Sequence, residues 1–293
     1  MKKINTLNIK IDDLSKYEHE CFIEIKKDPI IYGLLLDNGF SDELIKKNIG
    51  SCHTFYEDYY RWEKIKTYED VVNTGEKFNY KLIYDGKTII HERGILQPYQ
   101  TYMDYVSKFI IKDFGDEFNK VSLSKVNNRE LKNEIRIQLE SKSWIYLTGA
   151  IRSGRTYCAI ALANGSANNG NNDIAFLDAQ KEIKYLNDLY FNDSKEFLKM
   201  MQKLKESHLL IFDGMGNEYV NDIIRDTIII PLLQERAANR LMTIFTSDFS
   251  LEDLITLYSK KDKSGNNIKV KQMANILHSM IRKEIVTSKV ALY

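Results

Sequence analysis

Four short apolar runs that alternate with helix-forming segments constrain the fold of this chain more than any other feature. All four lie after residue 140, and they read WIYLT, IAFLD, LLIFD and MTIFTS. Short buried runs separated by helices are typical of βαβ units, in which parallel strands are covered by helices. The sequence therefore predicts an α/β fold with a parallel sheet in the second part of the chain.

The first hundred residues follow a different pattern. Apolar residues three and four positions apart, from Ile31 to Ile49, predict helices. Further on, two short apolar runs flank Asp85-Gly86 in KLIYDGKTII, which is a strong signal for a hairpin turn. We expect a mostly helical N-terminal domain with a small β-hairpin over residues 1–105, followed by the α/β domain over residues 106–293.

Composition excludes several classes of protein. The net charge of the 293 residues is +1, so any binding to nucleic acid needs a local basic patch. No apolar run is long enough to span a bilayer, and the N-terminal segment becomes charged too early for a signal peptide. Three scattered cysteines do not form a disulfide framework. We expect a cytoplasmic protein with reduced cysteines and no membrane contact.

The segment GAIRSGRT, residues 149–156, has the spacing of a phosphate-binding loop directly after the run WIYLT. The segment after it predicts a helix from Thr156 to about Asn164. Backbone N–H groups at such a helix start bind phosphate oxygens, whereas an ordinary strand-to-helix turn is the alternative. The usual lysine is replaced by Arg155, which is planar and bulkier. The predicted nucleotide-binding residues are Gly149, Ser153, Gly154, Arg155, Thr156 and Tyr157.

Two later strands are predicted to end beside this loop. LLIFD ends in Asp213, which can hold Mg²⁺ together with Thr156, although a helix cap is the alternative role. MTIFTS is followed by Asp248, and Ser247 and Asp248 lie where a sensor of the terminal phosphate is expected. Asp213 is the candidate catalytic acid, and the cofactors expected are ATP and Mg²⁺.

These motifs resemble a known family. Residues from about 110 to 293 are similar to the AAA+ domain of the bacterial replicative-helicase loaders of the DnaI/DnaC group, and the front segment resembles the DnaI type through its hairpin. The resemblance is densest in the segment from LLIFDGMG to FTSDFSLEDL. The matching positions are Asp213, Gly214, Met215, Gly216, Arg225, Asp226, Thr246, Ser247, Asp248 and Phe249.

The departures from the family pattern all fall on the chemistry of hydrolysis. Arg155 replaces the loop lysine, Gly214 the second acid, and Asp248 the sensor asparagine. The Glu-Arg pair of the last helix is replaced by Ala274 and Asn275. Losing a general base costs about 10²–10⁴ in rate, and losing a trans-acting arginine about 10³–10⁵. The sequence therefore predicts weak or absent ATP hydrolysis.

Two arginines remain on the helix after LLIFD. Arg225 is the second candidate catalytic residue. We expect Arg225 and Arg236 to face a neighbouring subunit or a partner.

The resemblance implies a function and partners. It implies a loader that binds the replicative DnaB-type helicase through the front domain and assists its loading onto single-stranded DNA. Direct contact with that DNA would involve a lysine-rich segment, and its candidate residues are Lys260, Lys261, Lys269 and Lys271. No zinc is expected, because Cys52-His53 and His19 with Cys21 lack the spacing of a zinc knuckle.

Two other functions stay open at this point. An AAA+ adaptor without any nucleotide is favoured by Arg155, Gly214 and Asp248, but not by the intact glycine spacing. An active ATPase helper of transposition shares the core fold but would not need the front domain.

Overall fold

The computed structural model describes residues 11–260 and 268–287. Contacts divide the chain into two compact units, residues 1–104 and residues 105–293. The sequence predicts a boundary near residue 105.

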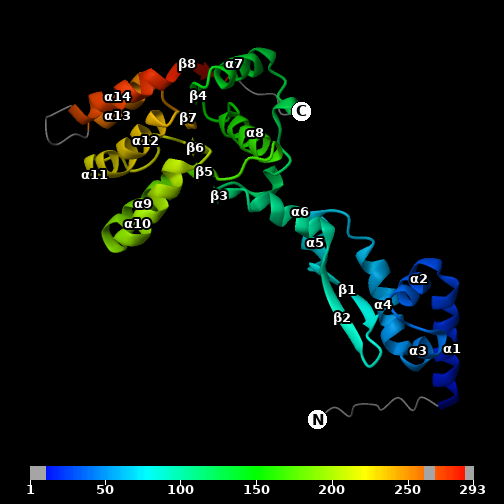
Figure 1. Ribbon diagram of the computed structural model, residues 1–293. Coiled ribbons are helices and arrows are strands. Elements are labelled where there is room, and N and C mark those ends of the chain that lie inside the picture. Colours follow the sequence, from blue (N-terminus) through cyan, green and yellow to red (C-terminus); the bar gives the residue numbers. More distant parts are fainter. Residues whose placement is uncertain (1–10, 261–267, 288–293) are drawn as a thin grey trace, which may run out of the picture. The chain divides into compact units, whose positions relative to one another are not determined.

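The first unit consists of short helices and one hairpin (Figure 1). Its elements are α1 (Ile11–Lys27), α2 (Pro29–Asp37), α3 (Asp42–Lys47), α4 (Ile49–Trp62), α5 (Tyr68–Thr74), β1 (Phe78–Tyr84) and β2 (Ile89–Ile95), and α6 (Gln97–Val106) spans the boundary. Local capping explains several helix starts: Asp28 accepts hydrogen bonds from two amides at the start of α2, and Thr67 forms a capping box with Asp70. The predicted helices and hairpin are confirmed.

The core of the first unit is formed by apolar side chains of the helices and one hairpin residue. Ile25, Cys52 and Phe55 are buried on α1 and α4, and Leu82 is the buried residue of β1. The ring of Trp62 packs edge-on against Tyr80 of the hairpin, with ring centres 4.9 Å apart. The aromatic cluster of α4 therefore belongs largely to this core.

The second unit is built on a six-stranded parallel sheet with the strand order β3-β5-β6-β7-β4-β8. Its strands are β3 (Phe109–Lys112), β4 (Trp144–Thr148), β5 (Ile174–Asp178), β6 (Leu209–Asp213), β7 (Met242–Ser247) and β8 (Ile281–Val286). The four predicted strands are confirmed. The two edge strands, β3 and β8, were not predicted: β3 has only four residues, and β8 (IRKEIV) mixes charged with apolar residues and is only partly buried.

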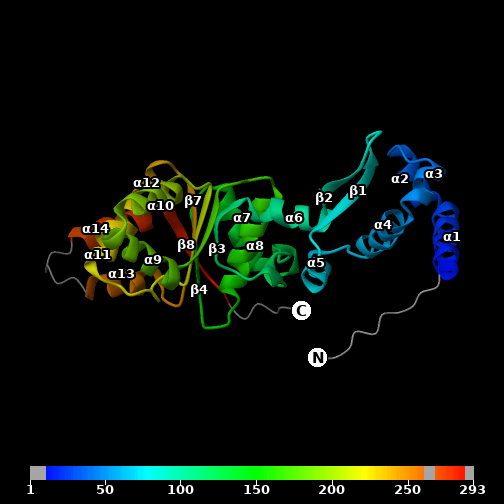
Figure 2. The ribbon, with the colours of Figure 1, turned by 90° about the horizontal axis from the view of Figure 1, so that it is seen from below.

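Helices cover both faces of this sheet. They are α7 (Arg129–Glu140), α8 (Arg155–Asn168), α9 (Ala179–Asn192), α10 (Ser194–Glu206), α11 (Asp222–Ile224), the π-helical turn η3 (Arg225–Ile229), α12 (Ile230–Ala238), α13 (Leu251–Lys260) and α14 (Ile268–Met280), with 3₁₀ turns η1 (Asp116–Phe118) and η2 (Leu123–Lys125). Figure 2 shows α7 and α8 on one side of the sheet and the helices α9 to α14 on the other.

Alternate residues along each strand point to opposite faces. Leu209 and Ile211 of β6 contact one buried apolar cluster, whereas Leu210 and Phe212 contact the other. Because both faces are buried, the strands are continuous apolar runs, as the sequence indicated.

Helix α8 is longer than the sequence predicted. The sequence predicts an end near Asn164, whereas α8 continues to Asn168. Asn164 is buried, and its amide nitrogen donates hydrogen bonds of 2.8 Å to the carbonyls of Phe118 and Val121, while Tyr105 donates to its oxygen at 2.6 Å. These hydrogen bonds to distant parts of the chain stabilise the last part of α8, for which the local sequence gives no helix signal.

Candidate nucleotide site

The predicted phosphate loop, residues 149–154, connects β4 to α8 at the carboxyl edge of the sheet. Gly149 has a φ of 149°, and a Cβ atom there would lie 2.5 Å from the carbonyl oxygen of Thr287. Gly154, with a φ of 93°, is the N-cap of α8. Arg152 has a φ of 64°, a left-handed conformation that costs a non-glycine residue about 1–2 kcal/mol. The loop thus has an intact glycine framework and one strained position.

Two of the predicted nucleotide-binding residues contact the protein interior instead. Ser153 is buried, and its hydroxyl shares a hydrogen bond with the Thr287 hydroxyl. Tyr157 packs against the apolar cluster beneath α8. Both side chains are thus used in contacts within the fold, and nucleotide binding by Ser153 and Tyr157 stays a prediction.

Thr156 and Asp213 are brought together as the sequence predicted. The Thr156 hydroxyl lies 2.9 and 3.0 Å from the two carboxylate oxygens of Asp213. Thr246 donates a further hydrogen bond of 2.7 Å to the same carboxylate. Burial raises the pKa of Asp213, and the hydrogen bonds from Thr246 and Thr156 partly offset this rise. A hydroxyl and a carboxylate in contact are suitable oxygen ligands for Mg²⁺.

Arg155 forms an ion pair with Asp248, the residue that follows β7. Asn217 donates a second hydrogen bond of 3.3 Å to the other oxygen of Asp248. Strand β7 lies directly beside β4, so the loop and Asp248 emerge from neighbouring strands at the same edge. The cation of the loop is therefore neutralised by a residue of the chain itself.

Ser247, the other predicted sensor residue, is fully buried. Its hydroxyl donates to the carbonyl of Met215 at 2.7 Å and accepts from the amide of Phe249 at 3.1 Å. The first contact holds the turn after β7 against the turn after β6, and the second lies within the turn after β7. The side chain of Ser247 is used in these structural contacts, and its role as a phosphate sensor stays a prediction.

The position of the missing second acid is occupied by a turn residue. Gly214 has a φ of 81°, and its amide donates to the Thr246 hydroxyl at 2.8 Å. The next carboxylate along the chain, Glu218, is buried, and it accepts hydrogen bonds from the Gly216 amide at 2.7 Å and from the Tyr258 hydroxyl. Burial raises the pKa of Glu218. Sequence reasoning missed this residue, because a glutamate in a polar turn gives no signal of burial.

Neither predicted partner-facing arginine is exposed in the second unit. Arg225 is 2% exposed and forms ion pairs with Asp222 and Asp226. Arg236 is 0% exposed, and its guanidinium donates to the carbonyls of Leu204, Ser207 and Met242 and to the hydroxyls of Ser207 and Thr243. We therefore correct the expectation that they face a neighbouring subunit, since their donors are used inside the fold.

The lysines proposed for DNA contact lie near the ends of two helices. Lys269 and Lys271 are exposed on α14, and Lys260 is the last residue of α13. Lys261 lies outside the described residues.

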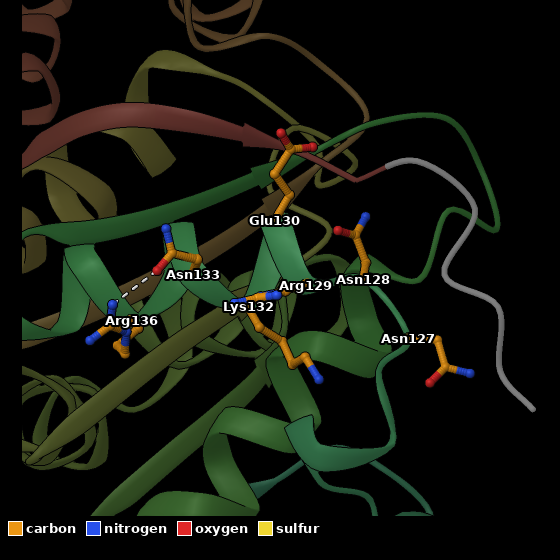
Figure 3. A pocket seen from close by; sticks show the side chains of 7 residues that line it. All are labelled: Asn127, Asn128, Arg129, Glu130, Lys132, Asn133 and Arg136. Carbon is orange, nitrogen blue, oxygen red and sulfur yellow. Dashed lines mark hydrogen bonds between the residues drawn. The ribbon is translucent and has the colours of Figure 1, made fainter.

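A separate hollow of about 860 Å³ lies at the start of α7. Figure 3 shows its polar lining, in which Arg136 bonds to Asn133. The lining residues are Asn127, Asn128, Arg129, Glu130, Lys132, Asn133 and Arg136. None of them belongs to the loop or to the strand ends described above.

Among the described residues, no group of three or more histidine, cysteine, aspartate or glutamate side chains could hold a metal ion. Within residues 11–260 and 268–287, every helix is too short or too polar to cross a bilayer.

Known proteins provide an independent comparison. No family model matches the chain. The chain is 23% identical over 258 residues to the replicative helicase loader DnaI of Bacillus subtilis (strain 168), which covers 83% of this chain and 82% of that protein.

Solved structures also match. A crystal structure of DnaI has a TM-score of 0.52 and 20% identity, covering 62% of this chain and 98% of that chain. The DnaC helicase loader has a TM-score of 0.44 and 20% identity, covering 59% and 100%, which is too low to support an argument. The chain therefore resembles the DnaI/DnaC-type helicase loaders, as its motifs indicated, and its second unit has the AAA+ fold.

Proposed function

We propose that this protein is a helicase loader in DNA replication, which binds a DnaB-type replicative helicase and assists its loading onto single-stranded DNA. One observation carries the proposal. The similarity to DnaI covers 83% of the chain and is therefore longer than the AAA+ unit, residues 105–293. It extends into the helical front unit, which a loader would use to hold its helicase.

The nucleotide site of this loader binds weakly and hydrolyses slowly or not at all. The loop amides, Arg155, Thr156 and Asp213 are the residues that would hold a nucleotide and Mg²⁺. The negative charge of the phosphates of a bound nucleotide would be the signal to which the loader responds. Weak hydrolysis is supported by Gly214, which has no side chain to activate water, and by the burial of Arg225 and Arg236.

Binding to the helicase is tested with the full-length chain. The protein is mixed with the replicative helicase of the same organism, with and without ATP and Mg²⁺, and the mass is measured by light scattering after size exclusion. We expect a complex, and we expect a variant lacking residues 1–104 to lose it while its AAA+ unit still unfolds cooperatively. No complex under any condition would exclude the loader function.

An adaptor that binds no nucleotide is the second candidate. The Arg155–Asp248 ion pair favours it, because Asp248 already neutralises the guanidinium of Arg155, which is the cation of the loop. Titration with ATP separates the two: no binding at millimolar ATP, together with a helicase complex that does not respond to ATP, would favour the adaptor.

Contact with single-stranded DNA belongs to the loader proposal and rests on the exposed side chains of Lys269 and Lys271. Replacing both with glutamine should weaken binding of an oligonucleotide and reduce its salt dependence.

A further inference from the structure

A phosphate ligand at the loop would have to break the ion pair between Arg155 and Asp248. Arg155 is the first residue of α8, and Asp248 lies 93 positions further along the chain. The two side chains are 14% and 32% exposed. In such a partly buried position, charges interact more strongly than on an open surface.

The carboxylate is held from two directions. One oxygen accepts from the Arg155 guanidinium and the other from the Asn217 amide. Asn217 belongs to the turn after β6, so Asp248 connects the phosphate loop to the ends of both β6 and β7. The carboxylate is therefore fixed beside the loop by groups of the chain itself.

Carboxylates and phosphates use the same chemistry on a guanidinium, since both accept its parallel N–H groups and neutralise its charge. A phosphate that binds Arg155 has to displace Asp248. Its own negative charge then lies near a carboxylate that has lost its cation. Both effects oppose binding, and the second grows with the charge of the ligand.

We propose that Asp248 is a built-in competitor for nucleotide phosphates at Arg155, which weakens binding and discriminates against the triphosphate relative to the diphosphate. This inference depends on the proposed nucleotide site but not on the helicase. It identifies Asp248 as the residue that decides ligand preference at the loop, where the motif alone suggested a sensor.

The test is a titration of the full-length protein with ATP and with ADP, both with Mg²⁺, followed by calorimetry. We expect Asp248→Asn to raise the affinity for ATP by about tenfold, equivalent to about 1.4 kcal/mol, and the affinity for ADP by less. Glu252→Gln is the matched control, because it removes one negative charge from an exposed position on α13 and should leave both affinities unchanged.

A second background shows whether Asp248 acts through Arg155. In Arg155→Gln, the additional change Asp248→Asn should alter ATP affinity by less than threefold, a coupling that a double-mutant cycle measures. An equal gain in both backgrounds would mean that Asp248 acts only as general negative charge, which would overturn the proposal.

Two further readouts keep the test independent of folding and of the helicase. Without nucleotide, Asp248→Asn should lower the melting temperature, because the ion pair is lost. Asn217→Ala, which removes the other contact of Asp248, should raise ATP affinity in the same direction but by less.

Unchanged ATP affinity in both Asp248→Asn and Asn217→Ala would overturn the competitor role and leave the helicase complex untouched. Conversely, a gain in affinity without a helicase complex would remove the loader function and leave this inference standing.

Discussion

Asp213 has a half-buried carboxylate at the end of β6. Its pKa is raised by burial, so between the unfolded value of about 3.9 and the folded value the native state binds more protons than the unfolded chain. The contribution of Asp213 to the free energy of unfolding therefore declines as pH rises through this window.

The substitution Asp213→Asn removes the titrating carboxyl group. The amide oxygen of the asparagine can still accept hydrogen bonds from Thr156 and Thr246. We expect the stability of Asp213→Asn relative to the unmodified protein to increase between about pH 4 and about pH 7. Urea unfolding at both pH values measures the difference. Asp188→Asn, an exposed acid on α9, controls for the loss of one charge. A difference that falls with pH would contradict the raised pKa.

At the scale of elements, the loop needs glycine at position 149, whereas helix α8 does not need it at position 165. A Cβ atom at Gly149 would lie 2.5 Å from the Thr287 carbonyl oxygen and 2.7 Å from its hydroxyl, whereas at Gly165, inside α8, it would meet nothing within 4 Å. The end of β8 is thus packed against the loop, but α8 has room for a side chain at Gly165.

We expect Gly149→Ala to lower the free energy of unfolding by about 1–3 kcal/mol, because the loop or the end of β8 has to shift. Gly165→Ala is the matched substitution, and it should raise the free energy of unfolding by about 0.5–1 kcal/mol. Denaturant unfolding of both variants tests this pair. If Gly149→Ala retained full stability, close packing between Gly149 and Thr287 would not hold.

At the scale of the whole molecule, each unit has its own buried core. The buried apolar residues of the first unit lie between Cys21 and Leu96, and those of the sheet unit between Val126 and Ile285. No buried member is shared among these clusters in the described ranges. This separation predicts that residues 1–104 fold without the AAA+ unit.

A fragment of residues 1–104 should give a helical circular dichroism spectrum and a cooperative thermal transition. Ile25→Ala in this fragment should cost about 2–4 kcal/mol, since Ile25 is 0% exposed. Ile23→Ala, on the same helix but 37% exposed, should have a much smaller effect. A fragment without a cooperative transition would show that this core needs the second unit.

Much of the fold and part of the site could be predicted from the sequence. The apolar runs placed β4, β5, β6 and β7, and the Asp85-Gly86 turn placed the hairpin, because these signals depend on local periodicity and turn chemistry. The contact between Thr156 and Asp213 also followed, since parallel strands of one sheet end at the same edge, and only β7 lies between β4 and β6.

The sequence by itself determined the parallel sheet, the position of the phosphate-type loop and the presence of a glycine, not a second acid, after Asp213. The tertiary structure decided the edge strands β3 and β8, the burial of Arg225, Arg236 and Glu218, and the ion pair between Arg155 and Asp248. These features arise from contacts between segments far apart in the chain. Local pattern does not encode such contacts, because the partner of a charged side chain is chosen by how the elements pack.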